Sequence, residues 1–289
     1  MNGEGTPAGG DVHQSFDTSV AHVARVYDYW LGGKDNFAVD RAAGDQAIAA
    51  YPNIVFSVRA NRAFLARTVQ YLAGEAGVRQ FLDIGTGIPA ANNTHEVAQA
   101  VAPDTRVVYV DNDPTVLAHA RALLTSGPAG VTDYIDADLR DTDKILDIAA
   151  ATLDFTQPVA IVLMAIVHLI PDEDDPYRVI TKLVGAVPAG SYLAMSHIAS
   201  DIETAALADA GSRVSHFIRQ KQTYRSHAQV LRFFDGLELV EPGLTRIQEW
   251  RPGSELEAKS PAALWGGVGR KRDGRPGDPA QVKDEAVPG

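Results

Sequence analysis

The chain contains no cysteine. Disulfide bonds, thiolate metal sites and thiol nucleophiles are therefore excluded together, because each of them requires a cysteine sulfur. A chain of 289 residues without disulfides fits a cytoplasmic protein, and we expect that location. No group of His, Asp and Glu has convincing metal-ligand spacing, so we also expect no metal site.

Long apolar runs and an excess of positive charge are also missing. No segment offers about 18 consecutive apolar residues, and residues 1–10 lack a basic-then-apolar signal pattern, so we expect no membrane partner. The chain has 26 Lys and Arg against 37 Asp and Glu, a formal net charge of -11. A surface this acidic repels polyanions, which disfavours a nucleic-acid substrate unless a local basic groove overrides it. Nothing in the sequence indicates the oligomeric state.

The composition along the chain divides it into a central region and two polar ends. Residues 1–14 and 273–289 are rich in Gly, Pro or charge without a period, and we interpret them as disordered tails. Helical spacing of apolar residues predicts an N-terminal helical cap over 15–78. The main domain is predicted at 79–272, with a helical insertion at 202–234 that caps the acceptor side.

Within the main domain, apolar strands alternate with amphipathic helices. This alternation predicts a mostly parallel sheet with right-handed crossovers and helices on both faces. The last two strands are expected to form a hairpin that completes the sheet. The predicted strands are seven segments: 80–84, 106–110, 132–135, 158–167, 190–196, 237–245 and 262–269.

The first strand ends in a glycine turn that carries most of the functional information. It contains Asp83, Gly85, Thr86 and Gly87, and the second strand ends in Asp111. A strand, a glycine turn, a helix and a second strand ending in a carboxylate form a nucleotide-binding half-fold. In such a sheet the ligand lies beyond the carboxyl ends of the strands.

The details of this turn favour S-adenosylmethionine (SAM) over a dinucleotide. The third glycine of a dinucleotide fingerprint is absent, and Pro89 stands within the turn. The carboxylate of Asp83 would repel a pyrophosphate, whereas it suits the ammonium group of SAM. Asp111 suits the ribose hydroxyls, and Asn112 is expected to flank the adenine. Asp138, just after the third strand, is a candidate acceptor for the adenine amino group.

Each of these assignments has a simpler alternative. The turn with Gly85 and Gly87 is also compatible with a tight connection, Asp111 with a cap of the following turn, and Asp138 with a solvated loop. Three such signals at successive strand ends favour the binding interpretation. The candidate cofactor set also includes Asn92, Leu139 and Ala165.

The order and spacing of the motifs resemble class I SAM-dependent methyltransferases. More narrowly, the chain resembles an actinobacterial S-adenosyl methyltransferase family that was long a domain of unknown function. The resemblance covers about residues 15 to 272 and implies the seven-stranded, Rossmann-like methyltransferase sheet and bound SAM. It implies no substrate. It is carried by these stretches: 24–36, 59–62, 81–87, 108–114, 138–141, 172–176 and 266–270.

Methyl transfer needs a base only when the acceptor must lose a proton. His168, after the apolar strand, is the first candidate for this role, and His197, after the fifth strand, is the second. In the alternative interpretation, the His168 side chain forms a hydrogen bond to a loop or stacks near the adenine. Cysteine-dependent pyrimidine methylation is excluded, and no Asn-Pro-Pro-Tyr type motif for exocyclic amines is present.

The segment from Tyr27 to Asn36 combines three aromatic side chains, two glycines and Lys34. One hypothesis is a lid over SAM, with Tyr27 or Tyr29 near the methyl group and Lys34 at the carboxylate. The alternative is a helix that packs its aromatic side chains on the sheet. Arg59 and Arg62 are rival partners for the carboxylate, because Arg binds carboxylates bidentately. In the alternative interpretation, both are solvated arginines on a helix surface.

The favoured function is therefore a SAM-dependent methyltransferase that acts on a small molecule by in-line displacement. The alternative from another class is a SAM-binding sensor or partner module without turnover. An NAD-dependent oxidoreductase is disfavoured by the missing third glycine and by Asp83. By analogy with other SAM-dependent methyltransferases, residues 213–225 lie where the acceptor pocket is often built. The acceptor atom is not indicated by the sequence.

Overall fold

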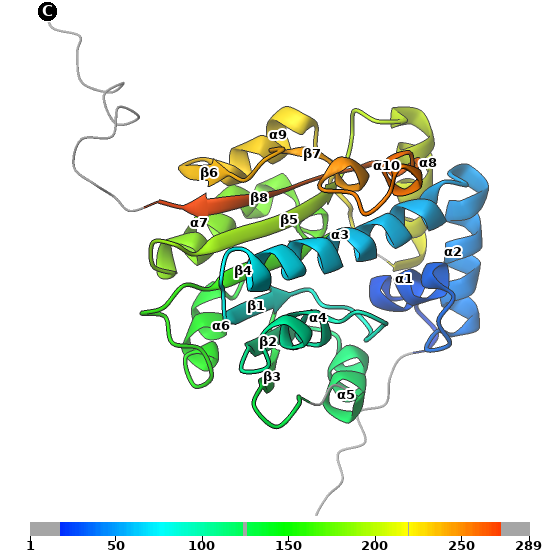
Figure 1. Ribbon diagram of the computed structural model, residues 1–289. Helices are drawn as coiled ribbons and strands as arrows, with labels where there is room; N and C mark the ends of the chain where they lie inside the picture. Colours follow the sequence, from blue (N-terminus) through cyan, green and yellow to red (C-terminus); the bar gives the residue numbers. More distant parts are fainter. Residues whose placement is uncertain (1–17, 124–125, 219, 273–289) are drawn as a thin grey trace, which may run out of the picture.

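The computed structural model describes residues 18–123, 126–218 and 220–272. The predicted tails, 1–14 and 273–289, lie outside the described residues. In the described part, one sheet of eight strands has the order β3-β2-β1-β4-β5-β8-β6, and β7 pairs with β8 (Figure 1). The strands are β1 Gln80–Ile84, β2 Arg106–Asp111, β3 Val131–Asp136, β4 Ala160–Met164, β5 Tyr192–Ile198, β6 Leu237–Leu239, β7 Thr245–Arg246 and β8 Leu264–Lys271.

The strand directions confirm the predicted class, a mostly parallel α/β sheet. Strands β1 to β5 pair in parallel, and β8 runs antiparallel to β5 and to β6. The predicted strand count is wrong by one, because the segment predicted as a single strand, 237–245, forms β6 and β7. A turn at Pro242 and Gly243, which has a φ of 92°, separates the two. The fourth predicted strand, 158–167, is also shorter and ends at Met164.

Helices cover both faces of the sheet, as predicted. Helices α3, α4 and α5 cover one face, and α6, α7 and α9 cover the other. The helices of eight or more residues are α1 Val23–Leu31, α2 Ala38–Ala50, α3 Ile54–Gly74, α4 Thr94–Val101, α5 Pro114–Leu123, α6 Thr142–Ala149, α7 Pro176–Ala186 and α8 Thr204–Ile218. The shorter ones are η1 Val167–Leu169, η2 Asp172–Asp174, α9 His227–Leu231, η3 Arg232–Phe234, η4 Ile247–Glu249 and α10 Glu255–Ala258.

Alternate side chains of each central strand enter opposite cores. In β1, Leu82 and Ile84 pack in the core on the side of α6 and α7, whereas Phe81 packs with α3 and α4. This two-residue period is a direct consequence of strand geometry. It places Asp83 on the α3 side of the sheet, at its carboxyl edge.

Two of the helices that follow strands begin at an aspartate that caps the helix N-terminus. The Asp113 carboxylate accepts a hydrogen bond from Thr115 N at 2.8 Å, so it caps α5 directly before Pro114. Asp175 caps α7 in the same way through Arg178 N. In both helices the capping Asp directly precedes a proline at the first helical position.

Helices α1 and α2 lie at the edge towards which the parallel strands run (Figure 1). Apolar spacing predicted a helical region here but did not indicate α2, which packs along α8. The cap predicted at 15–78 therefore contains three helices, and the third, α3, packs on the sheet itself. The domain boundaries stay a prediction. In the described part of the chain, no helix is long and apolar enough to cross a membrane.

Candidate active site

A cavity of about 190 Å³ lies at the carboxyl ends of β1 to β4 and is covered by α1. Most of the predicted site residues line it. The predicted residues in the cavity wall are Tyr27, Asp83, Gly85, Thr86, Gly87, Asp111, Asn112, Asp138, Leu139 and Ala165. The predicted residues outside the wall are Lys34, Arg59, Asn92, His168 and His197.

The turn after β1 has a backbone that only glycine adopts easily. Gly85 and Gly87 have φ values of 76° and 65°, in the left-handed region. A Cβ on Gly85 would also lie 2.4 Å from the Ile166 side chain. The turn is held to β2 by Gly85 N, which donates to Val110 O at 2.8 Å. The glycines therefore allow both the turn and the close packing of the loop after β4.

Asp83 is a buried acid in the cavity wall, with only 6% of its surface exposed. Burial raises the pKa of Asp83 to about 6, while the Thr94 hydroxyl and the nearby Arg62 charge oppose that rise. The Thr94 hydroxyl donates to its Oδ2 at 2.5 Å. A carboxylate that is costly to ionise is well suited to a cationic ligand, because the ligand restores the missing counter-charge.

Arg62, and not Arg59, reaches this cavity. Arg59 is exposed on α3, whereas Arg62 lines the cavity and donates from Nη2 to Ala91 O at 2.9 Å. Its Nε–H is buried and has no hydrogen-bond partner among the described residues. Arg62 and Asp83 thus present one positive and one negative group, which fits the two charges of an amino-acid moiety.

Asp111, at the end of β2, is tied to the glycine turn. Its Oδ2 accepts from Gly87 N and its Oδ1 from Asp113 N, both at 3.0 Å. Burial raises the pKa of Asp111, although these two bonds and His22 act in the opposite direction. Each carboxylate oxygen keeps a lone pair, so two neighbouring hydroxyls can bind here. The capping role considered as an alternative therefore coexists with ligand binding.

Asp138 is engaged more fully than the sequence suggested. Its Oδ1 accepts from N and Nε of Arg140, and its Oδ2 accepts from Nη2 of Arg140 and from Nδ2 of Asn112, at 2.8–3.0 Å. The Arg140 hydrogen bonds hold the pKa of Asp138 below its usual value, against the effect of burial. All four lone pairs are used, so an adenine amino group would have to displace Asn112 or Arg140. Arg140 lines the cavity and was missed, although it follows Asp138 by two positions.

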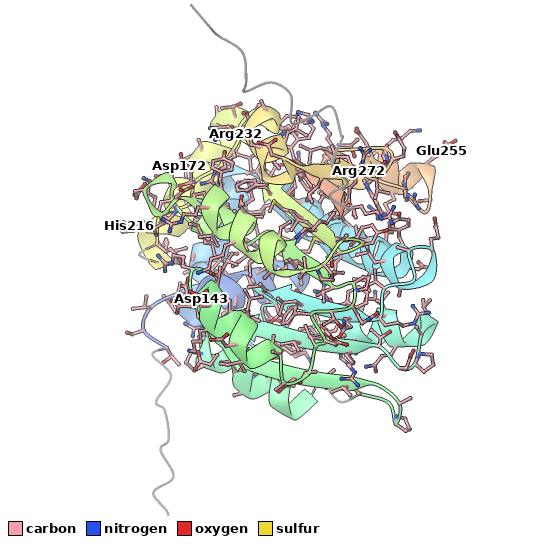
Figure 2. The ribbon with its side chains drawn as sticks, turned by 90° about the vertical axis from the view of Figure 1, so that its left-hand side faces the viewer. Asp143, Asp172, His216, Arg232, Glu255 and Arg272 are labelled. Atoms are coloured by element: carbon pink, nitrogen blue, oxygen red, sulfur yellow. The ribbon has the colours of Figure 1, made fainter. Side chains whose placement is uncertain are left out.

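An acidic turn anchors the loops around the cavity. Asp172 and Glu173 pair with Arg225 and Lys221 of the loop before α9, and Asp174 pairs with Arg140, which follows β3. The Arg225 guanidinium is buried and also donates to Val167 O and Ile170 O. Figure 2 shows Asp172 on the same side of the molecule as His216 of α8. This acidic turn therefore joins the loop after β4 to the loops that follow β3 and α8.

Both candidate bases are buried outside the cavity. His197 donates from Nδ1 to Ile198 O and accepts from Arg225 Nη1 at Nε2, so both ring nitrogens are used. His168 packs edge-on against that ring, with a centroid distance of 6.1 Å. Burial lowers the pKa of each to about 3, and the Arg225 charge adds to this effect. Such rings stay neutral and bind protons weakly, so we assign neither a base role.

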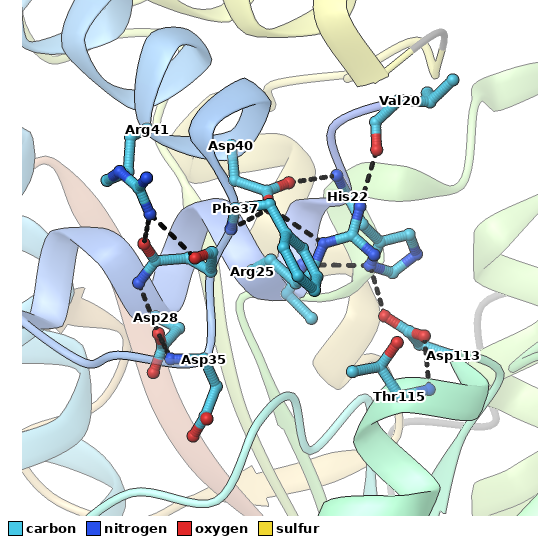
Figure 3. A network of polar contacts seen from close by, with 12 residues as sticks. Val20, His22, Arg25, Asp28, Asp35, Phe37, Asp40, Arg41, Asp113 and Thr115 are labelled. Atoms are coloured by element: carbon cyan, nitrogen blue, oxygen red, sulfur yellow. Dashed lines mark hydrogen bonds and ion pairs between the residues drawn. The ribbon is translucent and has the colours of Figure 1, made fainter. Parts of the chain in front are cut away.

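The unusual segment after Tyr27 folds around Asp28 (Figure 3). The Asp28 carboxylate accepts from Asp35 N at 3.0 Å and from Asn36 Nδ2 at 2.8 Å. A Cβ on Gly33 would collide with this carboxylate, which explains the second glycine. Lys34 is exposed and does not line the cavity. The segment therefore shapes the connection from α1 to α2.

Two polar contacts hold α1 at the cavity. Arg25 Nε and Asp40 Oδ2 lie 2.9 Å apart, and both side chains are at least 95% buried. His22 Nδ1 lies 2.7 Å from Asp113 Oδ2, which joins the start of α1 to the start of α5 (Figure 3). Helix α1 places Val23, Ala24 and Tyr27 in the cavity wall. No group of three or more possible metal ligands occurs among the described residues.

Comparison with known proteins identifies relatives over nearly the whole chain. A DUF574 family protein from Streptomyces avermitilis is 45% identical, with a TM-score of 0.85, over 88% of this chain and 99% of its own. A putative methyltransferase from Thermobifida fusca is 40% identical, with a TM-score of 0.82, over 89% and 97%. No curated protein gave a significant match.

A family model described as S-adenosyl methyltransferase matches residues 10–272. This range contains all the described residues that line the cavity. The charges in the wall also fit the cofactor of that family, because Asp83 and Arg62 match its amino-acid end and Asp111 its ribose. By this match, the chain belongs to the S-adenosyl methyltransferase family and is a SAM-dependent methyltransferase.

Proposed function

We propose that the chain transfers the methyl group of SAM to a small-molecule acceptor by in-line displacement. The observation that carries this proposal is the position of the cavity at the carboxyl ends of the strands, where Val23, Ala24 and Tyr27 of α1 form part of its wall. The formal net charge of -11 further disfavours nucleic acid as the acceptor.

In this proposal, different residues of the cavity wall bind different parts of SAM. Asp83 binds the ammonium group of the cofactor, Arg62 binds its carboxylate, and Asp111 binds its ribose hydroxyls. Asn112 and Leu139 flank the adenine. SAM itself supplies a methyl group on a positively charged sulfur. The protein then has to align the acceptor with that group and exclude water, which are the larger contributions to such a displacement.

The acceptor side of the cavity is mainly apolar. Met164, Ile166, Leu169 and Ile170 form it, with Gln220 as a polar neighbour. These side chains favour an acceptor with an apolar body and one nucleophilic atom. Because neither histidine is assigned as a base, an acceptor that loses no proton, or loses it readily, fits best.

We expect the affinity for SAM to fall as the pH drops below about 6. In the free protein the pKa of Asp83 is raised to about 6, so the carboxyl becomes protonated at lower pH. The cation binds the ionised form, so affinity decreases by about ten-fold per pH unit below that pKa. Calorimetric titration with SAM across this range measures the effect. The same pH dependence in Asp83→Asn would contradict the role of Asp83.

The acceptor class is tested with SAM that carries a labelled methyl group. We expect the protein to label a component of the small-molecule fraction of a cell extract, as read by mass spectrometry. Label in the protein or nucleic-acid fraction would contradict the proposed acceptor class. If SAM binds but no fraction is labelled, the chain is a binding module without turnover.

A further inference from the structure

A chain of hydrogen bonds connects the cavity wall to the centre of the sheet. Ala165 N, at the end of β4, donates to Ser196 Oγ at 3.0 Å, and this hydroxyl donates to Asn61 Oδ1 at 2.6 Å. Asn61 Nδ2 donates to the Tyr27 oxygen at 3.0 Å, and the Tyr27 hydroxyl donates to Val58 O at 3.2 Å. This series of hydrogen bonds therefore joins β4, β5, α3 and α1. Asn61 and Ser196 have no other role in the proposed site.

The direction of these bonds is fixed by the Ser196 hydroxyl. Ser196 is fully buried, and its oxygen already accepts from Ala165 N. Its proton needs an acceptor, and Asn61 Oδ1 is that acceptor. If the Asn61 amide were turned over, its NH₂ would face Ser196 and the serine proton would lose its partner, which is costly for a buried group. The amide nitrogen must therefore face Tyr27.

This direction determines what Tyr27 offers to the cavity. Its proton goes to Val58 O, and one lone pair of its oxygen accepts from Asn61. Burial raises the pKa of Tyr27, against the hydrogen bond from Asn61 and the Arg62 charge, so the group stays a neutral phenol. A second lone pair remains on the oxygen. Tyr27, Asn61 and Ala165 all line the same cavity, among apolar neighbours such as Leu65 and Met164.

We propose that Asn61 and Ser196 are positioning residues that hold the Tyr27 oxygen with its acceptor side towards the sulfonium end of SAM. The inference rests on the proposed function of the cavity. A positively charged sulfur polarises the C–H bonds of its methyl group, and an oxygen lone pair attracts both the charge and those C–H groups. The demethylated product has neither the positive charge on sulfur nor the methyl group. Tyr27 therefore distinguishes SAM from the product and favours product release.

The test compares the affinities for SAM and for its demethylated product by calorimetry, so it needs no acceptor. Tyr27→Phe should weaken SAM binding by about five-fold, which corresponds to about 1 kcal/mol, and leave product binding unchanged. Asn61→Leu should cause the same selective loss. When Asn61→Leu is combined with Tyr27→Phe, it should add no further selective loss, because Asn61 acts through the Tyr27 oxygen.

Two controls keep the test decisive. Tyr51→Phe removes another buried tyrosine hydroxyl, which donates to Pro261 O away from the cavity, and should change neither affinity. Ser196→Ala replaces Asn61→Leu if the latter does not fold, with the same expected selectivity. Equal weakening of both ligands by Tyr27→Phe, or no weakening, would overturn the inference. Failure of the unaltered protein to bind either ligand would instead refute the proposed cavity.

Discussion

Asp111→Ala should weaken SAM binding by about ten-fold or more. The carboxylate is the acceptor for the ribose hydroxyls, and hydrogen bonds to a charged group contribute about 1.5–3 kcal/mol. The change also removes the bonds that Asp111 accepts from Gly87 N and Asp113 N, so the glycine turn keeps its backbone bond to Val110 but loses the one to Asp111. Both effects act in the same direction, and calorimetric titration with SAM measures their sum.

The matched control for this variant is Asp136→Ala. Asp136 also ends a strand, β3, but it is exposed and lies outside the cavity wall. Its replacement should leave the affinity for SAM unchanged. Unchanged affinity in a folded Asp111→Ala protein would refute the ribose assignment. The other acids of the described cavity wall are Asp83, which is assigned to the ammonium group, and Asp138, whose lone pairs are used by Arg140 and Asn112.

Asp40→Ala should lower the free energy of unfolding by about 3–5 kcal/mol, the usual cost of removing one partner from a buried ion pair. Asp40 is fully buried and accepts from Arg25 Nε, His22 N and Phe37 N. The variant would leave the buried guanidinium of Arg25 without this carboxylate. Chemical denaturation followed by circular dichroism measures the loss, and SAM binding should weaken as α1 loosens.

An exposed ion pair provides the comparison for Asp40. Arg213 and Asp209 pair on the surface of α8, so Asp209→Ala should cost less than about 0.5 kcal/mol. The double variant Arg25→Met with Asp40→Leu should recover most of the lost stability, because apolar side chains often replace a buried pair without cost. A cost below about 1 kcal/mol for Asp40→Ala would show that the pair does not hold the cap.

Sequence periodicity predicted the sheet because strand and helix patterns alternate regularly, and the carboxyl ends of parallel strands must share one edge. For the same reason the clustering of Asp83 and Asp111 could be predicted without coordinates. Helix α2 was missed because its buried face consists of small residues and Asp40, which give no apolar period. A scan for small residues at spacings of three and four, such as Ala43 and Ala47, would have detected it.

Side-chain partners were harder to predict than positions. Arg59 and Arg62 have the same chemistry, and only the rotation of α3 decides that Arg62 lines the cavity. His168 follows an apolar strand, as expected, but the chain turns at Ala165, whose φ is 51°, and buries the ring elsewhere. The complete pairing of Asp138 with Arg140 depends on loop geometry, which a single sequence does not specify.

The most direct test of the account is a crystal structure of the protein with the demethylated product of SAM bound. We predict the ribose hydroxyls on Asp111, the amino-acid end between Asp83 and Arg62, and the sulfur facing the Tyr27 oxygen. A ligand bound in the reverse direction, with its adenine at Asp83, or bound outside this cavity, would contradict the account.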